Sequence, residues 1–108
     1  MLVELDVFSG RPNPRWELDK PSADVLRQLV SRLTVATDGP LEPPGLGYRG
    51  FILTDDTGRS RAYKGYMIRP DVVLADTSRS VERLLVERLP AEFQELRQRV
   101  ATEIEDVN

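Results

Sequence analysis

The sequence predicts a two-layer α+β domain, with an antiparallel sheet of four to five strands and three helices packed on one face. Short segments of alternating apolar and polar residues come in pairs joined by turn sequences, which indicates antiparallel strands. Other segments carry apolar residues every three or four positions, which indicates amphipathic helices. The length of 108 residues and the hydrophobic content of 40% suit one core, so we expect a single domain over residues 1–108.

The first two strands are predicted on either side of a loop rich in glycine and proline. Residues 2–8 alternate between apolar and acidic side chains, as in a strand with one buried face. Residues 15–18 form a short second strand with Trp16 and Leu18 directed inward. The intervening residues 9–14 predict an antiparallel hairpin with a wide turn.

A first helix is predicted from about Lys20 to a point between Leu33 and Thr37. Asp19 or Ser22 can cap its N-terminus. Its apolar stripe consists of Val25, Leu26, Leu29, Val30 and Leu33. The three prolines and four glycines of residues 38–50 then exclude regular structure for most of that segment.

The next strands surround a strong turn signal at residues 55–58. Residues 48–54 predict a strand, and residues 61–68 predict its return strand, with Gly65 marking a bulge. Residues 71–75 predict a short additional strand.

Two helices are predicted in the C-terminal third, which completes the order β-β-α-β-β-(β)-α-α. Asp76, Thr77 or Ser78 can cap the first, and Pro90 ends it. The second begins at Ala91 and carries a stripe of Phe93, Leu96, Val100 and Ile104. That stripe fits either the cover of the sheet in a monomer or the seam of a homodimer.

Composition excludes several kinds of chemistry. The chain has neither Cys nor His, so disulfides, thiolate chemistry and the usual general base near neutral pH are excluded. We therefore expect no cofactor, and any metal ion would have to be bound by oxygen ligands. The net charge of −3 argues against nucleic acid or an anionic membrane as a partner. Acidic residues interrupt the first apolar run, which favours a cytoplasmic protein over a secreted one.

The loop between the first two strands holds the most unusual residues. Pro12 and Pro14 stiffen it, and a stiff loop that presents guanidinium and amide donors beside an indole suits a carboxylate, a phosphate or a peptide backbone. A second segment, residues 46–50, places two glycines around a tyrosine and an arginine. The candidate binding residues are Ser9, Arg11, Asn13, Arg15, Trp16, Tyr48 and Arg49. The alternative is a hairpin turn with Trp16 in the core and a flexible entry to a strand.

A strand followed by FSGRPNPxW (residues 8–16), with LGYRGF (residues 46–51) later, resembles a group of short uncharacterised bacterial proteins. The resemblance spans most of the chain and implies that the two segments act together. It carries no activity and transfers no catalytic residue.

The sequence also carries thirteen arginines against two lysines, a bias that fits either anion recognition or a high-GC bacterial genome. Three carboxylates, Glu4, Asp6 and Glu17, fall on one face of the first hairpin. They suit either a solvated strand face or a site for Mg²⁺ or Ca²⁺.

These observations favour a non-enzymatic binding or accessory module, monomeric or homodimeric. It would recognise a peptide or protein partner through the Ser9–Trp16 loop and the Tyr48–Gly50 segment. The alternative is a small-molecule anion- or carboxylate-binding protein, or a small enzyme, in which Arg11, Arg15 and Arg49 form a clamp. No catalytic residue and no metal site are assigned.

Overall fold

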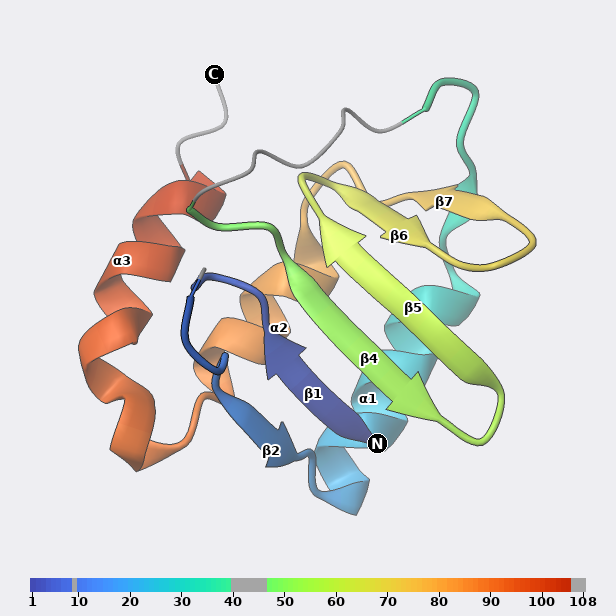
Figure 1. Cartoon of the computed structure of the whole chain (residues 1–108). Helices are drawn as coiled ribbons and strands as arrows, with labels where there is room; N and C mark the ends of the chain where they lie inside the picture. Colours follow the sequence, from blue (N-terminus) through green and yellow to red (C-terminus); the bar gives the residue numbers. More distant parts are fainter. Residues whose placement is uncertain (9, 40–46, 106–108) are drawn as a thin grey trace.

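The computed structural model describes residues 1–8, 10–39 and 47–105, and all its strands belong to one sheet (Figure 1). In chain order the elements are β1 (Leu2–Leu5), β2 (Arg15–Glu17), α1 (Lys20–Ser31), β3 (Thr34–Val35), β4 (Phe51–Asp55), β5 (Gly58–Tyr63), β6 (Tyr66–Ile68), β7 (Val73–Ala75), α2 (Ser80–Glu87), the 3-10 turn η1 (Ala91–Phe93) and α3 (Gln94–Glu105). Helices occur together with an antiparallel sheet, so the predicted α+β class is confirmed.

The predicted strand count of four to five is wrong, because the described part of the chain forms a seven-stranded sheet in the order β2-β1-β4-β5-β6-β7-β3. Residues 61–68 are two strands, not one with a bulge at Gly65. Lys64 and Gly65 have φ values of 48° and 83°, so they form a two-residue hairpin turn between β5 and β6. The other unpredicted strand is β3, which pairs over two residues with β7.

The predicted hairpin of the first two strands is present. β1 lies between β2 and β4, so that Val3 faces Trp16 on one side and Leu53 on the other. The strand predicted from residue 48 starts later, at Phe51. Gly50 precedes it with a φ of 90°, a conformation that a strand does not accommodate.

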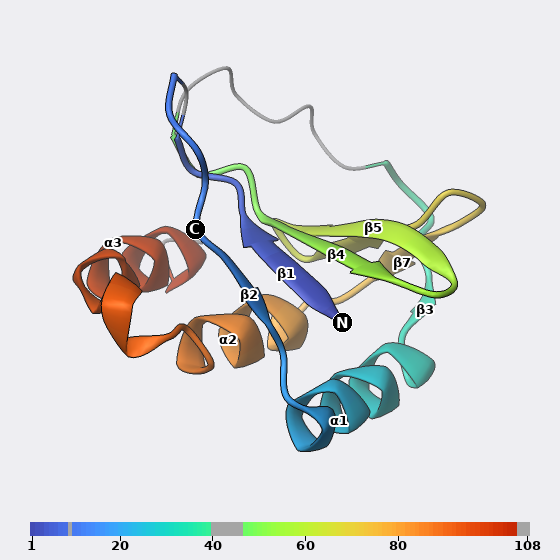
Figure 2. The ribbon, with the colours of Figure 1, turned by 60° about the horizontal axis from the view of Figure 1, so that its bottom comes forward.

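The two faces of the sheet differ. Figure 2 shows α1, α2 and α3 together on one face, here called the inner face. Phe51 and Leu53 of β4 join the buried core between the sheet and the helices. Ile52, between them, points to the other face, here called the outer face. It is buried but lies outside the core cluster, since neighbouring side chains of the sheet cover it.

Aspartate side chains fix the start of two helices. Asp19 caps α1 by accepting the N–H of Ser22 at 2.8 Å, as its position predicts. Asp76 accepts the N–H groups of Ser80 and Val81 at 3.1 and 3.0 Å, and so caps α2 from within the preceding turn.

The last helix covers the core of the monomer. Residues 91–93 form a 3-10 turn, so α3 itself starts at Gln94 and not at Ala91 as predicted. Val100 and Ile104 are fully buried in the core cluster, and Phe93 and Leu96 pack against its edge. The stripe therefore contacts its own chain.

Of the helices in the described ranges, none is long and apolar enough to cross a membrane.

Candidate functional site

A single carboxylate, Asp6, holds the two predicted segments together. Arg49 donates from Nε and Nη2 to Oδ1 of Asp6 at 3.1 and 2.7 Å. Arg61 of β5 donates from Nη1 to Oδ2 at 2.8 Å. Burial raises the pKa of this carboxyl group, but hydrogen bonds from Arg61 and Arg49, together with their charges, outweigh burial and hold the pKa below its ordinary value. Asp6 is therefore an ionised structural anchor.

Asn13 uses its whole amide within the chain. Its Oδ1 accepts the N–H groups of Val7 at 3.0 Å and Phe8 at 2.8 Å. Its Nδ2 donates to Glu4 at 3.0 Å and to Asp6 at 3.2 Å. An amide side chain offers two donors and an acceptor with two lone pairs, so none of this capacity is left for a ligand. Asn13 fastens the loop to the end of β1.

The backbone completes the junction. The N–H of Asp6 donates to the carbonyl of Gly50 at 2.9 Å, and the N–H of Arg49 donates to the carbonyl of Asp6 at 2.8 Å. Arg49 also donates from Nη2 to the carbonyl of Phe8 at 2.8 Å. Asp6 thus links the loop of Asn13 to the segment of Arg49, although thirty residues of chain lie between residues 16 and 47.

Gly50 is required by close packing at this junction. A Cβ atom at position 50 would lie 2.3 Å from the carbonyl oxygen of Ala62, and the φ of 90° disfavours any other residue. Both observations place the glycine in the structure of the junction and not at a ligand.

The two aromatic candidates lie in or at the core. The half-buried Trp16 packs against Phe51 and Phe93, each at 6.4 Å between ring centroids. Its buried Nε1 has no hydrogen-bond partner among the described residues. Tyr48 is 6% exposed, and its hydroxyl donates to Glu82. Tyr48 is therefore a buried core residue, and Trp16 packs against the edge of the core.

Tyr48 leads to a buried ion pair that sequence reasoning did not find. Glu82 of α2 accepts from Nε of Arg79 at 3.0 Å, from Nη2 at 2.7 Å, and from the N–H of Gly65 at 2.9 Å. Burial would lower the pKa of Arg79, but the hydrogen bonds and charge of Glu82 raise it. Burial and the adjacent Glu82 carboxylate raise the pKa of the Tyr48 hydroxyl. The cluster joins α2 to the β5–β6 turn and to the Tyr48 segment.

Nothing in the sequence marks Glu82 as buried. The apolar stripe of its helix begins at Val81, and an acidic residue in a first helical turn is ordinarily explained by the helix dipole. Only the turn at Arg79, which has a φ of 57°, brings the guanidinium back over the carboxylate.

Arg11 and Arg15 are exposed in the loop, as is Pro12. Arg11 lies over the ring of Phe8, with Cζ 3.7 Å from the ring centroid. Arg15 donates from Nε toward Glu4 at 3.1 Å and remains largely exposed. Ser9 lies outside the residues that the structure describes. The three arginines of the predicted clamp have these partners among the described residues: the ring of Phe8 for Arg11, Glu4 for Arg15, and Asp6 with the Phe8 carbonyl for Arg49.

The outer face of the sheet continues from this junction. Register places Arg61 beside Ile52 and Ile68, and Arg59 beside Thr54. A shallow depression of about 280 Å³ lies there, bordered by Ile52, Ile68, Arg59 and Arg61. No helix covers this face in the described part of the chain (Figure 2).

The three carboxylates weighed as a metal site are engaged with cationic or amide groups of the chain. Asp6 binds two arginines, and Glu4 binds Arg15 and Asn13. Glu17 lies at the other end of β2, opposite Leu2. Over residues 1–8, 10–39 and 47–105, no group of three acidic side chains is arranged to hold a metal ion.

Comparison of the chain with protein-family models, curated proteins and solved structures finds no match.

Proposed function

We propose that this protein is a binding module that recognises an acidic peptide segment of a partner protein on the outer face of the sheet. From the Ser9–Trp16 loop and the Tyr48–Gly50 segment, the side chains of Arg11, Arg15 and Arg49 form one end of that surface. The depression over β4, β5 and β6 forms its centre.

The observation that carries the proposal is the local charge. Five arginines, here called the outer arginine surface, lie at the junction and on the outer strands: Arg11, Arg15, Arg49, Arg59 and Arg61. Glu4 and Asp6 are the carboxylates that form salt bridges with these arginines among the residues that the structure describes, so this surface is positive although the whole chain has a net charge of −3. A positive surface on an acidic protein favours an acidic partner.

The chemistry of the surface suits a peptide. Arg59 is exposed and makes no hydrogen bond or salt bridge with the residues that the structure describes, so its guanidinium can bind a carboxylate in a bidentate manner. Ile52 and Ile68 supply apolar contact between the arginines. An extended peptide presents alternate side chains to a sheet surface at matching intervals.

The same geometry supports binding over catalysis at this surface. Proton transfer near neutral pH requires a carboxyl group whose pKa is raised toward that range. The surrounding arginines lower the pKa of Asp6 instead. The ionised Asp6 therefore positions the two arginines that bind it.

The test uses two labelled peptides of equal length. One alternates Glu with Val and the other alternates Lys with Val, and fluorescence polarisation measures their binding at low and at high salt. We expect the Glu peptide to bind, the Lys peptide not to bind, and the affinity for the Glu peptide to fall with added salt.

Matched variants locate the surface. Arg59→Ala is expected to weaken binding of the Glu peptide by about tenfold. The control is Arg99→Ala, which removes an exposed arginine of α3 and is expected to leave binding unchanged. Equal binding of both peptides, or equal effects of the two variants, would show that the outer face is not the recognition surface.

A further inference from the structure

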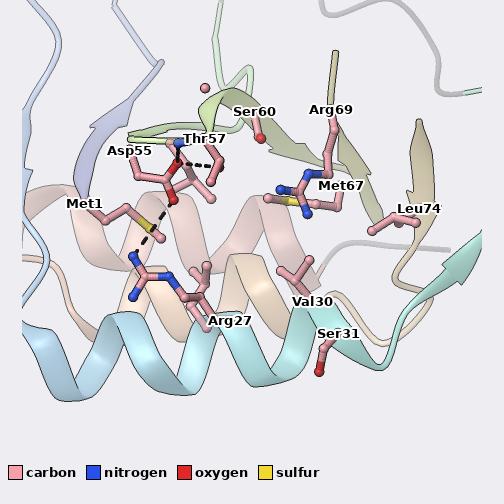
Figure 3. Close-up of a pocket in the computed structure, with 13 residues that line it drawn as sticks. Met1, Arg27, Val30, Ser31, Asp55, Thr57, Ser60, Met67, Arg69 and Leu74 are labelled. Atoms are coloured by element: carbon pink, nitrogen blue, oxygen red, sulfur yellow. Dashed lines mark hydrogen bonds and ion pairs between the residues drawn. The ribbon is translucent and has the colours of Figure 1, made fainter. Parts of the chain in front are cut away.

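A second concave site lies on the inner side of the sheet, away from the outer arginine surface. It is a cavity of about 290 Å³ between α1 and strands β4 to β7. Figure 3 shows α1 running beneath the strands, with side chains from both layers directed into the space between them. The volume lies just below the range of about 300–1,000 Å³ that is typical of ligand pockets.

The cavity exists because β5 carries small residues where the core needs large ones. Register places Gly58 beside Asp55 and Ser60 beside Leu53, so both Gly58 and Ser60 belong to the inner face. A Cβ atom at Gly58 would meet nothing within 4 Å. A large apolar residue at position 60 would fill this space, as the rest of the core is filled.

The walls of the cavity are apolar. Leu26 and Val30 contribute from α1, and Leu53, Met67 and Leu74 contribute from the strands. Leu26, Leu53 and Met67 are almost fully buried. An apolar ligand body would therefore be removed from water on most of its surface.

The mouth of the cavity carries the charge. Figure 3 shows the side chains of Arg27 and Arg69 reaching toward the cavity from opposite layers, with Asp55 near Arg27. Asp55 accepts the N–H of Thr57 at 2.9 Å and its hydroxyl at 2.6 Å, and lies 3.9 Å from Arg27. Asp55 is therefore already engaged on the Arg27 side.

Arg69 is the second cation of the mouth. Its guanidinium makes no hydrogen bond or salt bridge with any residue in the described ranges, although the pKa of Asp55, lowered mainly by its hydrogen bonds with Thr57, is lowered further by the charges of Arg27 and Arg69. It is only partly exposed and lies beside the buried Met67 in the close-up. A guanidinium in that position can bind a carboxylate at the end of an apolar ligand.

We propose that this cavity binds a small amphipathic carboxylate. The alkyl or aryl body lies between α1 and the strands, and the carboxylate is held by Arg69. Inorganic phosphate would use only the mouth, and a neutral apolar molecule would use only the walls. An amphipathic carboxylate uses both the apolar walls and the guanidinium of Arg69.

The chain offers built-in reporters for a test. Its two methionines, Met1 and Met67, both line the cavity. Protein labelled with ¹³C at the methionine methyl groups is titrated with octanoate, octanamide, acetate and inorganic phosphate. We expect octanoate to shift both methyl signals to saturation, octanamide to bind about tenfold more weakly or worse, and acetate and phosphate to cause no methyl shift.

Two variants examine the two halves of the site. Ser60→Leu fills the cavity and is expected to abolish the octanoate shifts while the folded protein becomes more stable, so loss of binding cannot be a loss of folding. Arg69→Met keeps the apolar surface and is expected to reduce octanoate affinity to that of octanamide. Arg59→Met, on the outer face, is the matched control and is expected to leave octanoate affinity unchanged.

The outcomes separate this site from the outer arginine surface. Arg69 and Ser60 both also border the outer depression, but the strand register directs the Ser60 side chain to the inner face with Leu53, so Ser60→Leu and Arg59→Met are the decisive pair. The first is expected to affect octanoate alone and the second the acidic peptide alone. Equal affinities for octanoate and octanamide, an unchanged affinity in Ser60→Leu, or the absence of methyl shifts would each overturn the proposal.

Discussion

Removal of the Asn13 side chain tests whether the first loop is fastened to the protein or free to bind. Asn13→Ala deletes four hydrogen bonds, two from backbone N–H groups and two to carboxylates. Asp6 and Glu4 keep their arginine partners, so the loss at the carboxylates is small. The two backbone groups are only partly buried, and water compensates in part.

The expected loss of stability in Asn13→Ala follows from those four hydrogen bonds. Each contributes a net stabilisation of about 1 kcal/mol, and each backbone donor left without an acceptor adds to the loss. We therefore expect Asn13→Ala to lower the free energy of unfolding by roughly 2–4 kcal/mol. For a domain of this size, the urea midpoint should fall by roughly 1–2 M.

Urea unfolding followed by tryptophan fluorescence measures this change. Trp16 is the only tryptophan and packs between Phe51 and Phe93, so its emission reports the loss of the core. Arg11→Ala, in the same loop, is the control and should change the free energy by less than about 0.5 kcal/mol. If Asn13→Ala proves as mild as Arg11→Ala, the hydrogen bonds of Asn13 do not hold the loop and our reasoning is wrong.

Three further predictions concern buried groups. Glu82→Gln leaves the buried Arg79 without a counter-charge and should destabilise the protein by about 3–5 kcal/mol in urea unfolding; a loss below about 1 kcal/mol would contradict the buried ion pair. The lowered pKa of Asp6 stabilises the folded state above the ordinary carboxyl pKa of 3.8, so this part of the stability is lost as the pH falls through the lower, folded-state pKa. Asp6→Asn should remove that part of the pH dependence, and an unchanged pH profile would contradict the prediction. Gly50→Ala forces a Cβ atom against the carbonyl of Ala62 and should prevent or severely weaken folding, as measured by circular dichroism; a normal melting curve would show that the junction can relax.

The regular parts of the fold were predictable because their signals are local. The alternation of residues 2–5 defines β1, and the position of Asp19 before Pro21 defines the start of α1. Each signal depends on neighbours within a few positions, and the physical rules for caps and alternation act over the same range.

The additional strands were not predictable for two reasons. The turn at Lys64–Gly65 lacks the Asn-Gly or Asp-Gly pair that usually marks such hairpins, so the alternation of residues 61–68 concealed a reversal. β3 has two exposed residues and no pattern of burial; it is a strand only because β7 offers a partner.

The candidate site was also predictable in part, since its residues were found from the sequence but their contacts were not. The sequence singled out Asn13 and Arg49, and the structure gives both of them specific contacts. The sequence does not indicate whether these side chains point outward to a ligand or inward to the chain. Asn13 is held between two prolines and turned inward to the chain, while the cavity at Ser60 arises from a small residue that looks ordinary on a strand.

The sequence by itself determined the α+β class, the position of the first hairpin and of the helices, and the two segments that meet at Asp6. Tertiary structure decided how many strands join the sheet, which arginines stay exposed, and where the two concave sites lie. The physical reason is that helix periodicity, caps and turns depend on adjacent residues. Strand pairing, buried ion pairs and cavities depend instead on residues that meet only after folding.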